Sequence, residues 1–156
     1  MNAEIRIAAT ENEMEEARHI FQEYQNWLGF DLCFQNFDAE LKGLPGRYAP
    51  PDGRLYLLYI AGEVQGCIGL RRFDGSRCEM KRLYIRPAAR GSGFGSRLVE
   101  KIIADAREIG YFSMLLDTYP PKMGEAAKIY GSHGFLAIPP YYHNPYDGVV
   151  FMELVL

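Results

Sequence analysis

The spacing of apolar positions changes several times along the chain, and each change predicts a new element. Residues Glu4 to Ala9 alternate between apolar and polar side chains, which predicts a short strand. A helix follows, because apolar residues then recur at helical spacing; Thr10 or Asn12 can cap it, and Gly29 is expected to end it. A second short helix is predicted from about Phe37 to Leu44.

The middle of the chain reads as a β-meander. Short apolar runs alternate with turn residues such as Gly62-Glu63 and Asp74-Gly75, which is typical of antiparallel strands joined by tight turns. Pro87 is expected to end the last strand. The three predicted strands are Leu55 to Ala61, Val64 to Arg71 and Cys78 to Arg86.

The second half holds the strongest helix signal, at Ser96 to Ile109, with Gly110 as its stop. A buried strand, a second helix and a final strand are predicted after it, at Met114 to Asp117, Glu125 to His133 and Val149 to Val155. A loop rich in proline and tyrosine, Pro139 to Gly148, precedes the final strand. The predicted order is βααβββαβαβ, which places the chain in the α/β (α+β) class.

Composition excludes several classes of protein. The chain has 156 residues, of which 48% are hydrophobic and 24% charged, as expected for one soluble globular domain over residues 1–156. A formal net charge of −3 argues against a dedicated nucleic-acid binder. No apolar run reaches the roughly 20 residues of a membrane span, and the start of the sequence lacks a signal-peptide core. We therefore expect a cytoplasmic protein with no nucleic-acid or membrane partner.

Cysteine and histidine positions give no sign of a metal or disulfide framework. Cys33, Cys67 and Cys78 are odd in number and form no CxxC spacing. The three histidines, His19, His133 and His143, do not share a ligand spacing. We expect reduced thiols and no metal site.

A glycine-rich run between a strand and the strongest helix is the main candidate for chemistry. It reads Arg90-Gly91-Ser92-Gly93-Phe94-Gly95-Ser96. Glycines let the backbone approach an anion closely, and the first amides of a helix have no partner inside the helix. Such a loop can hold a phosphate at the positive end of the helix dipole, with Arg90 adding a fixed charge.

Three alternatives compete for this run. A Walker A loop would need a Gly-Lys-Ser/Thr ending, which is missing. A Rossmann fingerprint would need G-x-G-x-x-G in a parallel βαβ unit, whereas Gly91, Gly93 and Gly95 follow an antiparallel meander. A flexible loop without a ligand is the third alternative.

The run from Glu79 to Gly95 resembles the central motif of the GNAT acetyltransferases. Their signature, Gln/Arg-x-x-Gly-x-Gly/Ala between a strand and a helix, is matched by Arg90, Gly93 and Gly95. A second motif of this family, Tyr-x-x-x-Gly-Phe at the end of a later helix, is matched by Tyr130, Gly134 and Phe135. The element order fits as well. The resemblance implies the GNAT fold, a mixed sheet of about six to seven strands flanked by about four helices.

The resemblance also implies acetyl-CoA as co-substrate, bound in a V-shaped opening between two parallel strands. The strand around Leu83, Tyr84 and Ile85 would pair with the pantetheine arm and supply an oxyanion donor. Arg90 and the amides of Gly91, Ser92, Gly93, Phe94, Gly95 and Ser96 would hold the pyrophosphate. The helix that bears Ala126, Ile129 and Tyr130 would flank the thiol.

Two side chains are candidates for catalysis. Tyr130 matches the family tyrosine that faces the CoA sulfur, where its phenol can protonate the departing thiolate; the alternative is an aromatic on a buried helix stripe. Glu79 lies eleven residues before Arg90 and is the candidate general base, with a raised pKa as the expectation. Its alternative is an ion pair with Lys81 or Arg77.

Aromatic residues mark the expected acceptor side: Tyr24, Trp27, Phe30, Phe34, Tyr141, Tyr142, His143 and Tyr146. They are consistent with a substrate pocket, with core packing or with a homodimer contact. The resulting hypothesis is an N-acetyltransferase that moves acetyl from acetyl-CoA to a primary amine by direct attack in a ternary complex, with a small molecule favoured as acceptor. An acyl-CoA-binding sensor or regulatory module is the alternative.

Overall fold

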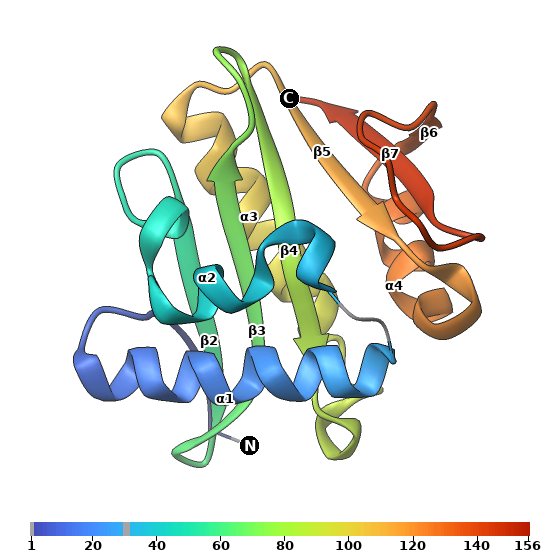
Figure 1. The fold of residues 1–156 in the computed structure, drawn as a ribbon. Coiled ribbons are helices and arrows are strands. Elements are labelled where there is room, and N and C mark those ends of the chain that lie inside the picture. Colours follow the sequence, from blue (N-terminus) through green and yellow to red (C-terminus); the bar gives the residue numbers. More distant parts are fainter. Residues whose placement is uncertain (1, 30–31) are drawn as a thin grey trace.

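The computed structural model of the protein describes residues 2–29 and 32–156, without the side chains of Cys33 and Phe34. Its centre is a seven-stranded sheet in the order β1-β2-β3-β4-β5-β7-β6 (Figure 1). The strands are β1 (Ala3–Ile7), β2 (Arg54–Ile60), β3 (Glu63–Arg72), β4 (Arg77–Ile85), β5 (Ser113–Thr118), β6 (Leu136–Ile138) and β7 (Val150–Val155).

Helices cover both faces of this sheet. They are α1 (Glu11–Leu28), α2 (Phe37–Lys42), α3 (Phe94–Ile109) and α4 (Pro120–Ser132). Figure 1 shows α1 and α2 on one face and α3 on the other, and α4 contacts both α3 and β5. Short 3₁₀ turns lie at Leu32–Gln35, Gly46–Tyr48 and Pro87–Ala89. The predicted α/β class and GNAT-like architecture are confirmed.

The alternation of β2 divides the core into two clusters. Leu57 and its neighbours on one face pack with Phe21 and Tyr48, beneath α1 and α2. Leu58 faces the other way and packs with Leu98 and Ile102 of α3. Successive side chains of β2 point to opposite faces of the sheet, so this strand contributes to both layers of the core. This explains why β2 is apolar along almost its whole length.

Local signals account for most element ends. Thr10 caps α1 in a reciprocal capping box: its hydroxyl accepts the Glu13 amide at 3.1 Å, and the Glu13 carboxylate accepts the Thr10 amide at 2.9 Å. Gly29, with φ of 78°, ends the helix. The predicted start of α4 at Glu125 is wrong, since the helix begins at Pro120 and accepts two prolines in its first turn. The predicted order also lacks β6, whose three residues are too short to show a period.

β4 and β5 are the only parallel neighbours among the described strands, and they part after three pairs. The paired residues are Arg77↔Ser113, Cys78↔Met114 and Glu79↔Leu115. Beyond Glu79, β4 carries a bulge in which Arg82 and Leu83 oppose one residue of β3, and Arg82 takes the left-handed conformation with φ of 63°. The edge of β4 from Met80 onward is thereby freed from β5, which opens the sheet where the functional site lies.

Candidate active site

A groove of about 660 Å³ lies where β4 and β5 separate. One wall is the end of β4, the second is the start of α3, and the third is the first half of α4. Its lining residues are Trp27, Leu83, Tyr84, Ile85, Ala89, Arg90, Gly91, Gly93, Phe94, Gly95, Pro120, Pro121, Lys122, Met123, Gly124, Glu125, Ala126 and Ile129.

The glycine loop forms one end of this groove. Gly91 and Gly93 have φ of 89° and 80°, conformations that side chains strongly disfavour, and Gly93 is the N-cap of α3. The first amide in this region that donates to another described backbone group is that of Arg97, which bonds the Gly93 carbonyl at 3.1 Å. No hydrogen bond from the amides of residues 91–96 is found within the described chain, so these donors are available at a helix N-terminus.

Two cations flank the same groove, with an indole ring between them. The guanidinium carbon of Arg90 lies 4.9 Å from the centre of the Trp27 ring, and the Lys122 ammonium lies 5.7 Å from it. Arg90 is held in place because its Nε donates to the Ile85 carbonyl at 2.8 Å. The mouth of the groove is therefore positive, which suits an anionic ligand.

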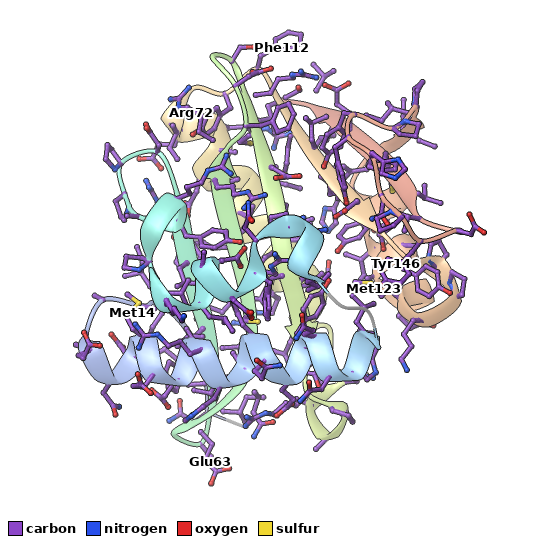
Figure 2. The ribbon with its side chains drawn as sticks, in the orientation of Figure 1. Met14, Glu63, Arg72, Phe112, Met123 and Tyr146 are labelled. Carbon is purple, nitrogen blue, oxygen red and sulfur yellow. The ribbon has the colours of Figure 1, made fainter. Side chains whose placement is uncertain are left out.

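A smaller inner pocket continues from the groove. Leu83 and Met123 line both cavities, so the two adjoin. Met123 marks a kink in α4, with φ of −115° and ψ of 35°, beside the C-terminal end of α1 (Figure 2). The other lining residues of the inner pocket are Tyr24, Met80, Lys81, Arg82, Asp117 and Tyr130.

Tyr130 is a buried phenol in this inner pocket. Its ring packs against Phe135, with centroids 5.8 Å apart. Burial, with the nearby Tyr24 and the Asp117 carboxylate, raises the pKa of Tyr130 above its ordinary value, so the phenol stays protonated. No hydrogen bond to its hydroxyl is found from the described residues. The group is therefore a protonated donor in the wall of the inner pocket, which adjoins the groove.

A third cavity adjoins the inner pocket on the side of α1 and the tail. We call it the acceptor pocket, because the resemblance to the GNAT family leads us to expect the acceptor on this side. Tyr24, Arg82, Asp117 and Met123 line both cavities. Its free volume is about 30 Å³. The remaining lining residues come from α1, the 3₁₀ turn after it, the end of β5 and the tail, and they are Leu28, Leu32, Gln35, Thr118, Tyr119, Asn144 and Val149.

Buried ion pairs support the walls of these pockets. Arg82 binds Glu40 of α2 with two hydrogen bonds of 2.9 Å, and it donates a third, also 2.9 Å, to Gln35. Arg71 binds Glu79 at 2.9 Å, and Lys81 lies 3.4 Å from Asp117 and 4.0 Å from Glu79. These three acids and three bases balance in charge, as buried charges must to remain ionised.

The acids of this network remain anionic. Burial alone would raise the pKa of each carboxyl, but the cations more than offset it. Arg82 lowers the pKa of Glu40. Lys81 and Arg71 lower that of Glu79, and Lys81 with the Tyr142 hydroxyl lowers that of Asp117.

The structure corrects the expected raised pKa of Glu79. This carboxylate is 3% exposed and lies in the paired part of β4, where it accepts hydrogen bonds from Arg71 and from the Tyr141 hydroxyl at 2.7 Å. Its pKa is lowered, and it does not appear among the lining residues of the groove, the inner pocket or the acceptor pocket. Of the two ion-pair partners expected from the sequence, Lys81 lies 4.0 Å from Glu79, whereas Arg77 pairs with Asp74 instead; the shortest ion pair of Glu79 is with Arg71.

Most other predicted site residues meet at the groove. Leu83, Tyr84, Ile85, Arg90, Gly91, Gly93, Phe94, Gly95, Ala126 and Ile129 all line it. Ser92 and Ser96 are not among its lining residues; the Ser96 hydroxyl instead contacts His133 Nε2 at 3.0 Å. Tyr84 is held by Glu23, which accepts its hydroxyl at 2.9 Å, while Gly95 leaves room for Ile129, whose Cδ1 would lie 3.1 Å from a Cβ there.

The residues of the predicted aromatic wall do not share one cavity. Tyr24 lines the inner and acceptor pockets, but Trp27 lines the groove. Tyr141 and Tyr142 donate to Glu79 and Asp117 respectively. His143 is exposed. Phe30 and the side chain of Phe34 lie outside the described residues, as does the side chain of Cys33.

Several residues were missed by sequence reasoning. Asp117, Thr118 and Met123 line the central cavities, yet no motif singles them out. One signal was present, because Asp117 is a carboxylate at the end of an otherwise apolar strand. Within the described residues, no group of three or more His, Cys, Asp or Glu side chains could hold a metal ion. None of the described helices has the length and apolar character needed to cross a bilayer.

Comparisons with known proteins agree with this geometry. The sequence model of the acetyltransferase (GNAT) family matches residues 8–135. An uncharacterized N-acetyltransferase of Schizosaccharomyces pombe is 39% identical over 98% of this chain and 94% of its own length. An uncharacterized N-acetyltransferase of Dictyostelium discoideum is 30% identical over 97% of this chain and 99% of its own length.

Solved structures share the fold. An acetyltransferase from Streptococcus agalactiae superposes with a TM-score of 0.81 at 21% identity, covering 99% of this chain and 98% of that one. An acetyltransferase from Salmonella typhimurium, solved with acetyl-CoA, superposes with a TM-score of 0.67 at 21% identity, covering 99% of this chain and 94% of that one.

Proposed function

Because the chain belongs to the GNAT family of N-acetyltransferases, we propose that it moves the acetyl group of acetyl-CoA to the primary amine of a small molecule. The observation that carries this proposal is the groove between β4 and α4, which has unpaired helix amides at one end and the Tyr130 phenol beyond the other. This arrangement matches a donor with a diphosphate at one end and a thioester at the other.

The donor would lie along the groove. Its diphosphate would accept hydrogen bonds from the amides of residues 91–96, with Arg90 and Lys122 adding positive charge. The freed edge of β4 at Leu83 to Ile85 would pair with the amide groups of the pantetheine arm. The Salmonella typhimurium acetyltransferase shares this fold and was solved with acetyl-CoA, which supports acetyl-CoA as the donor.

The chemistry needs one proton donor and one acceptor. The amine nitrogen attacks the thioester carbon, the new C–N bond forms, and the C–S bond breaks to release a thiolate. Tyr130 would give its phenol proton to that thiolate, and the proton lost by the amine nitrogen would restore the phenol by way of a base or solvent. The products are the amide and free CoA, and no acyl-enzyme forms.

In this proposal Glu79, the predicted base, acts mainly as an anchor for a neighbouring segment. Its lowered pKa and its bonds to Arg71 and Tyr141 favour an anchoring role for the segment that carries Tyr141. Removal of the amine proton through Glu79 would need a relay, because the carboxylate does not line the cavities. The acceptor pocket draws its walls from several segments of the chain and so suits a compact amine better than an extended peptide.

The proposal is tested by binding and by turnover. Calorimetric titration is expected to show tight binding of acetyl-CoA and weak binding of ATP and NAD⁺. A panel of small primary amines is then expected to release CoA thiol from acetyl-CoA. Binding of ATP or NAD⁺ in preference to acetyl-CoA would overturn the donor assignment. Tight acetyl-CoA binding without thiol release across the panel would favour a sensor.

A further inference from the structure

Asp117 lies between the inner pocket, where the thioester would react, and the acceptor pocket. It lines the inner pocket beside Tyr130 and also the acceptor pocket beside Asn144. Its side chain is 15% exposed, against 4% for Glu79. An acceptor that reaches the thioester through this pocket must therefore pass the Asp117 carboxylate.

The Asp117 carboxylate has capacity for another hydrogen bond. A carboxylate offers about four acceptor positions. Within the described part of the chain, one oxygen of Asp117 accepts from Lys81 at 3.4 Å, a long bond, and the other accepts from the Tyr142 hydroxyl. Positions on the oxygens remain for the N–H groups of a ligand.

A phenol fixes the direction in which this carboxylate points. The Tyr142 oxygen accepts from Gln35 Nε2 at 3.2 Å and from Asn144 Nδ2 at 3.0 Å, while its own hydrogen goes to Asp117. Chains of hydrogen bonds of this kind strengthen one another and hold their members in place. Residues from the 3₁₀ turn, β5 and the tail are thereby tied together around the pocket.

A second, independent feature of the acceptor pocket points to a polar ligand. Thr118 is 3% exposed, and its hydroxyl has no hydrogen-bond partner among the described residues. An unsatisfied buried hydroxyl is costly, so such groups in native proteins call for an explanation. A ligand with a hydrogen-bonding group in this pocket supplies one.

The size of the pocket limits what enters it. Its free volume is about 30 Å³. A cavity needs about 10–15 Å³ of such free volume to hold one water molecule, so this pocket has room for about two groups of that size. An ammonium group and the carbon that bears it fill this space, and a further N-methyl group would crowd it. Apolar walls at Leu28, Leu32 and Val149 favour carbon next to the nitrogen.

From these observations we infer that Asp117 receives the acceptor nitrogen and that the acceptor is an unhindered primary amine with a hydrogen-bonding group within reach of Thr118. This inference rests on the proposed acetyl transfer. The amine enters as an ammonium ion and bonds to the Asp117 carboxylate, which aligns the nitrogen with the thioester held beside Tyr130. One ammonium proton passes to solvent before the nitrogen attacks, and the second, lost after the attack, restores the Tyr130 phenol. Glu79, with Arg71 and Tyr141 already on its oxygens, is not the group that meets the amine.

The test compares steady-state kinetics of variants on the best substrate among ethanolamine, 1,4-diaminobutane and phenethylamine. Asp117→Asn, which keeps the size of the side chain, is expected to raise KM for the amine at least about tenfold, with the Kd for acetyl-CoA changed less than about twofold. Glu79→Gln is the matched comparison, because it neutralises the other carboxylate beside Lys81, which does not line the pockets. An equal or larger rise in amine KM for Glu79→Gln would overturn the inference.

Thr118 gives a test that does not depend on the ion pairs. Thr118→Val is expected to raise amine KM about fivefold for a hydroxylated amine such as ethanolamine, without loss of thermal stability, whereas Thr118→Ser is expected to restore it. N-methylethanolamine is expected to react at least about tenfold more slowly than ethanolamine in the unaltered protein. If the protein acetylates amines but the KM for the amine is unchanged in both Asp117→Asn and Thr118→Val, the inference is refuted and the proposed function stands. Absence of turnover with every amine would refute the proposed function as well.

Discussion

The ring of Trp27 stands 4.9 Å from the guanidinium carbon of Arg90, across the mouth of the groove between β4 and α4. Lys122 approaches the same ring from α4, at 5.7 Å. Trp27 is the single tryptophan of the sequence. Its emission therefore reports on this groove and on no other part of the protein.

Acetyl-CoA is expected to change the fluorescence of Trp27. A diphosphate between Arg90 and Lys122 would draw both cations away from the ring and alter its surroundings. A titration followed at the tryptophan emission is expected to saturate, with a Kd equal to that from calorimetry.

Trp27→Phe is the control for this signal. It is expected to abolish the fluorescence change while calorimetry still detects acetyl-CoA. Calorimetric binding to the unaltered protein with no change in emission would place the ligand elsewhere.

Tyr130→Phe is expected to lower kcat about 100-fold, because the thiolate would lose its proton donor. The Kd for acetyl-CoA is expected to change less than about twofold. The edge-to-face contact of the ring with Phe135 is kept, so the melting temperature is also expected to remain near that of the unaltered protein. Stopped-flow thiol release separates the chemical step from product release, and an unchanged chemical step would remove Tyr130 from the mechanism.

Glu40→Gln is expected to destabilise the fold by about 3 kcal/mol. Arg82 is 4% exposed, and the substitution removes the anion that accepts two of its hydrogen bonds. Urea unfolding at pH 7 measures the change in the free energy of unfolding. As a control, Lys128→Gln removes an ion pair with Glu125 on the exposed face of α4 and is expected to change stability by less than about 0.5 kcal/mol.

Acid is expected to weaken the fold in a defined pH range. Glu40, Glu79 and Asp117 have lowered pKa values in the folded protein, so the unfolded chain binds protons first as the pH falls. Their stabilising contribution is complete above the ordinary carboxyl values of 4.5 and 3.8 and is lost as the pH drops through the lower folded values. The free energy of unfolding should be level from pH 7 to about 5.5 and decline below about 4.5. A free energy of unfolding that stays level down to pH 3 would contradict the stabilising contribution of these three carboxylates.

Much of the fold could be predicted from local patterns, and the exceptions have physical causes. Thr10 and Gly29 mark the ends of α1 because caps are local signals, and β2 to β4 follow from turn residues between apolar runs. The start of α4 was missed because Pro120 and Pro121 are equally compatible with a loop. β6 forms by pairing with β7, and its three residues are too few to show the alternation that predicts a strand.

The site residues likewise divide into those that a local motif predicts and those that become neighbours only on folding. The groove residues around Gly93 follow from a motif, because close backbone approach requires particular residues in sequence. Asp117 and Thr118 could not be singled out, since their importance depends on Gln35 and Asn144, which are far away along the chain. The lowered pKa of Glu79 likewise depends on cations brought near by folding, including Arg71 of β3.

Met123 is the residue that lines the groove, the inner pocket and the acceptor pocket together. On its two sides the walls come largely from different segments. The end of β4 and the glycine loop border the groove, whereas the segments that carry Leu32 and Gln35, and Asn144 and Val149, border the acceptor pocket. Substitutions in the latter segments can change which amine is taken while the donor is held as before. Descendants of one ancestor can thus keep the glycine loop and diverge in acceptor, so a shared loop is no guide to a shared substrate.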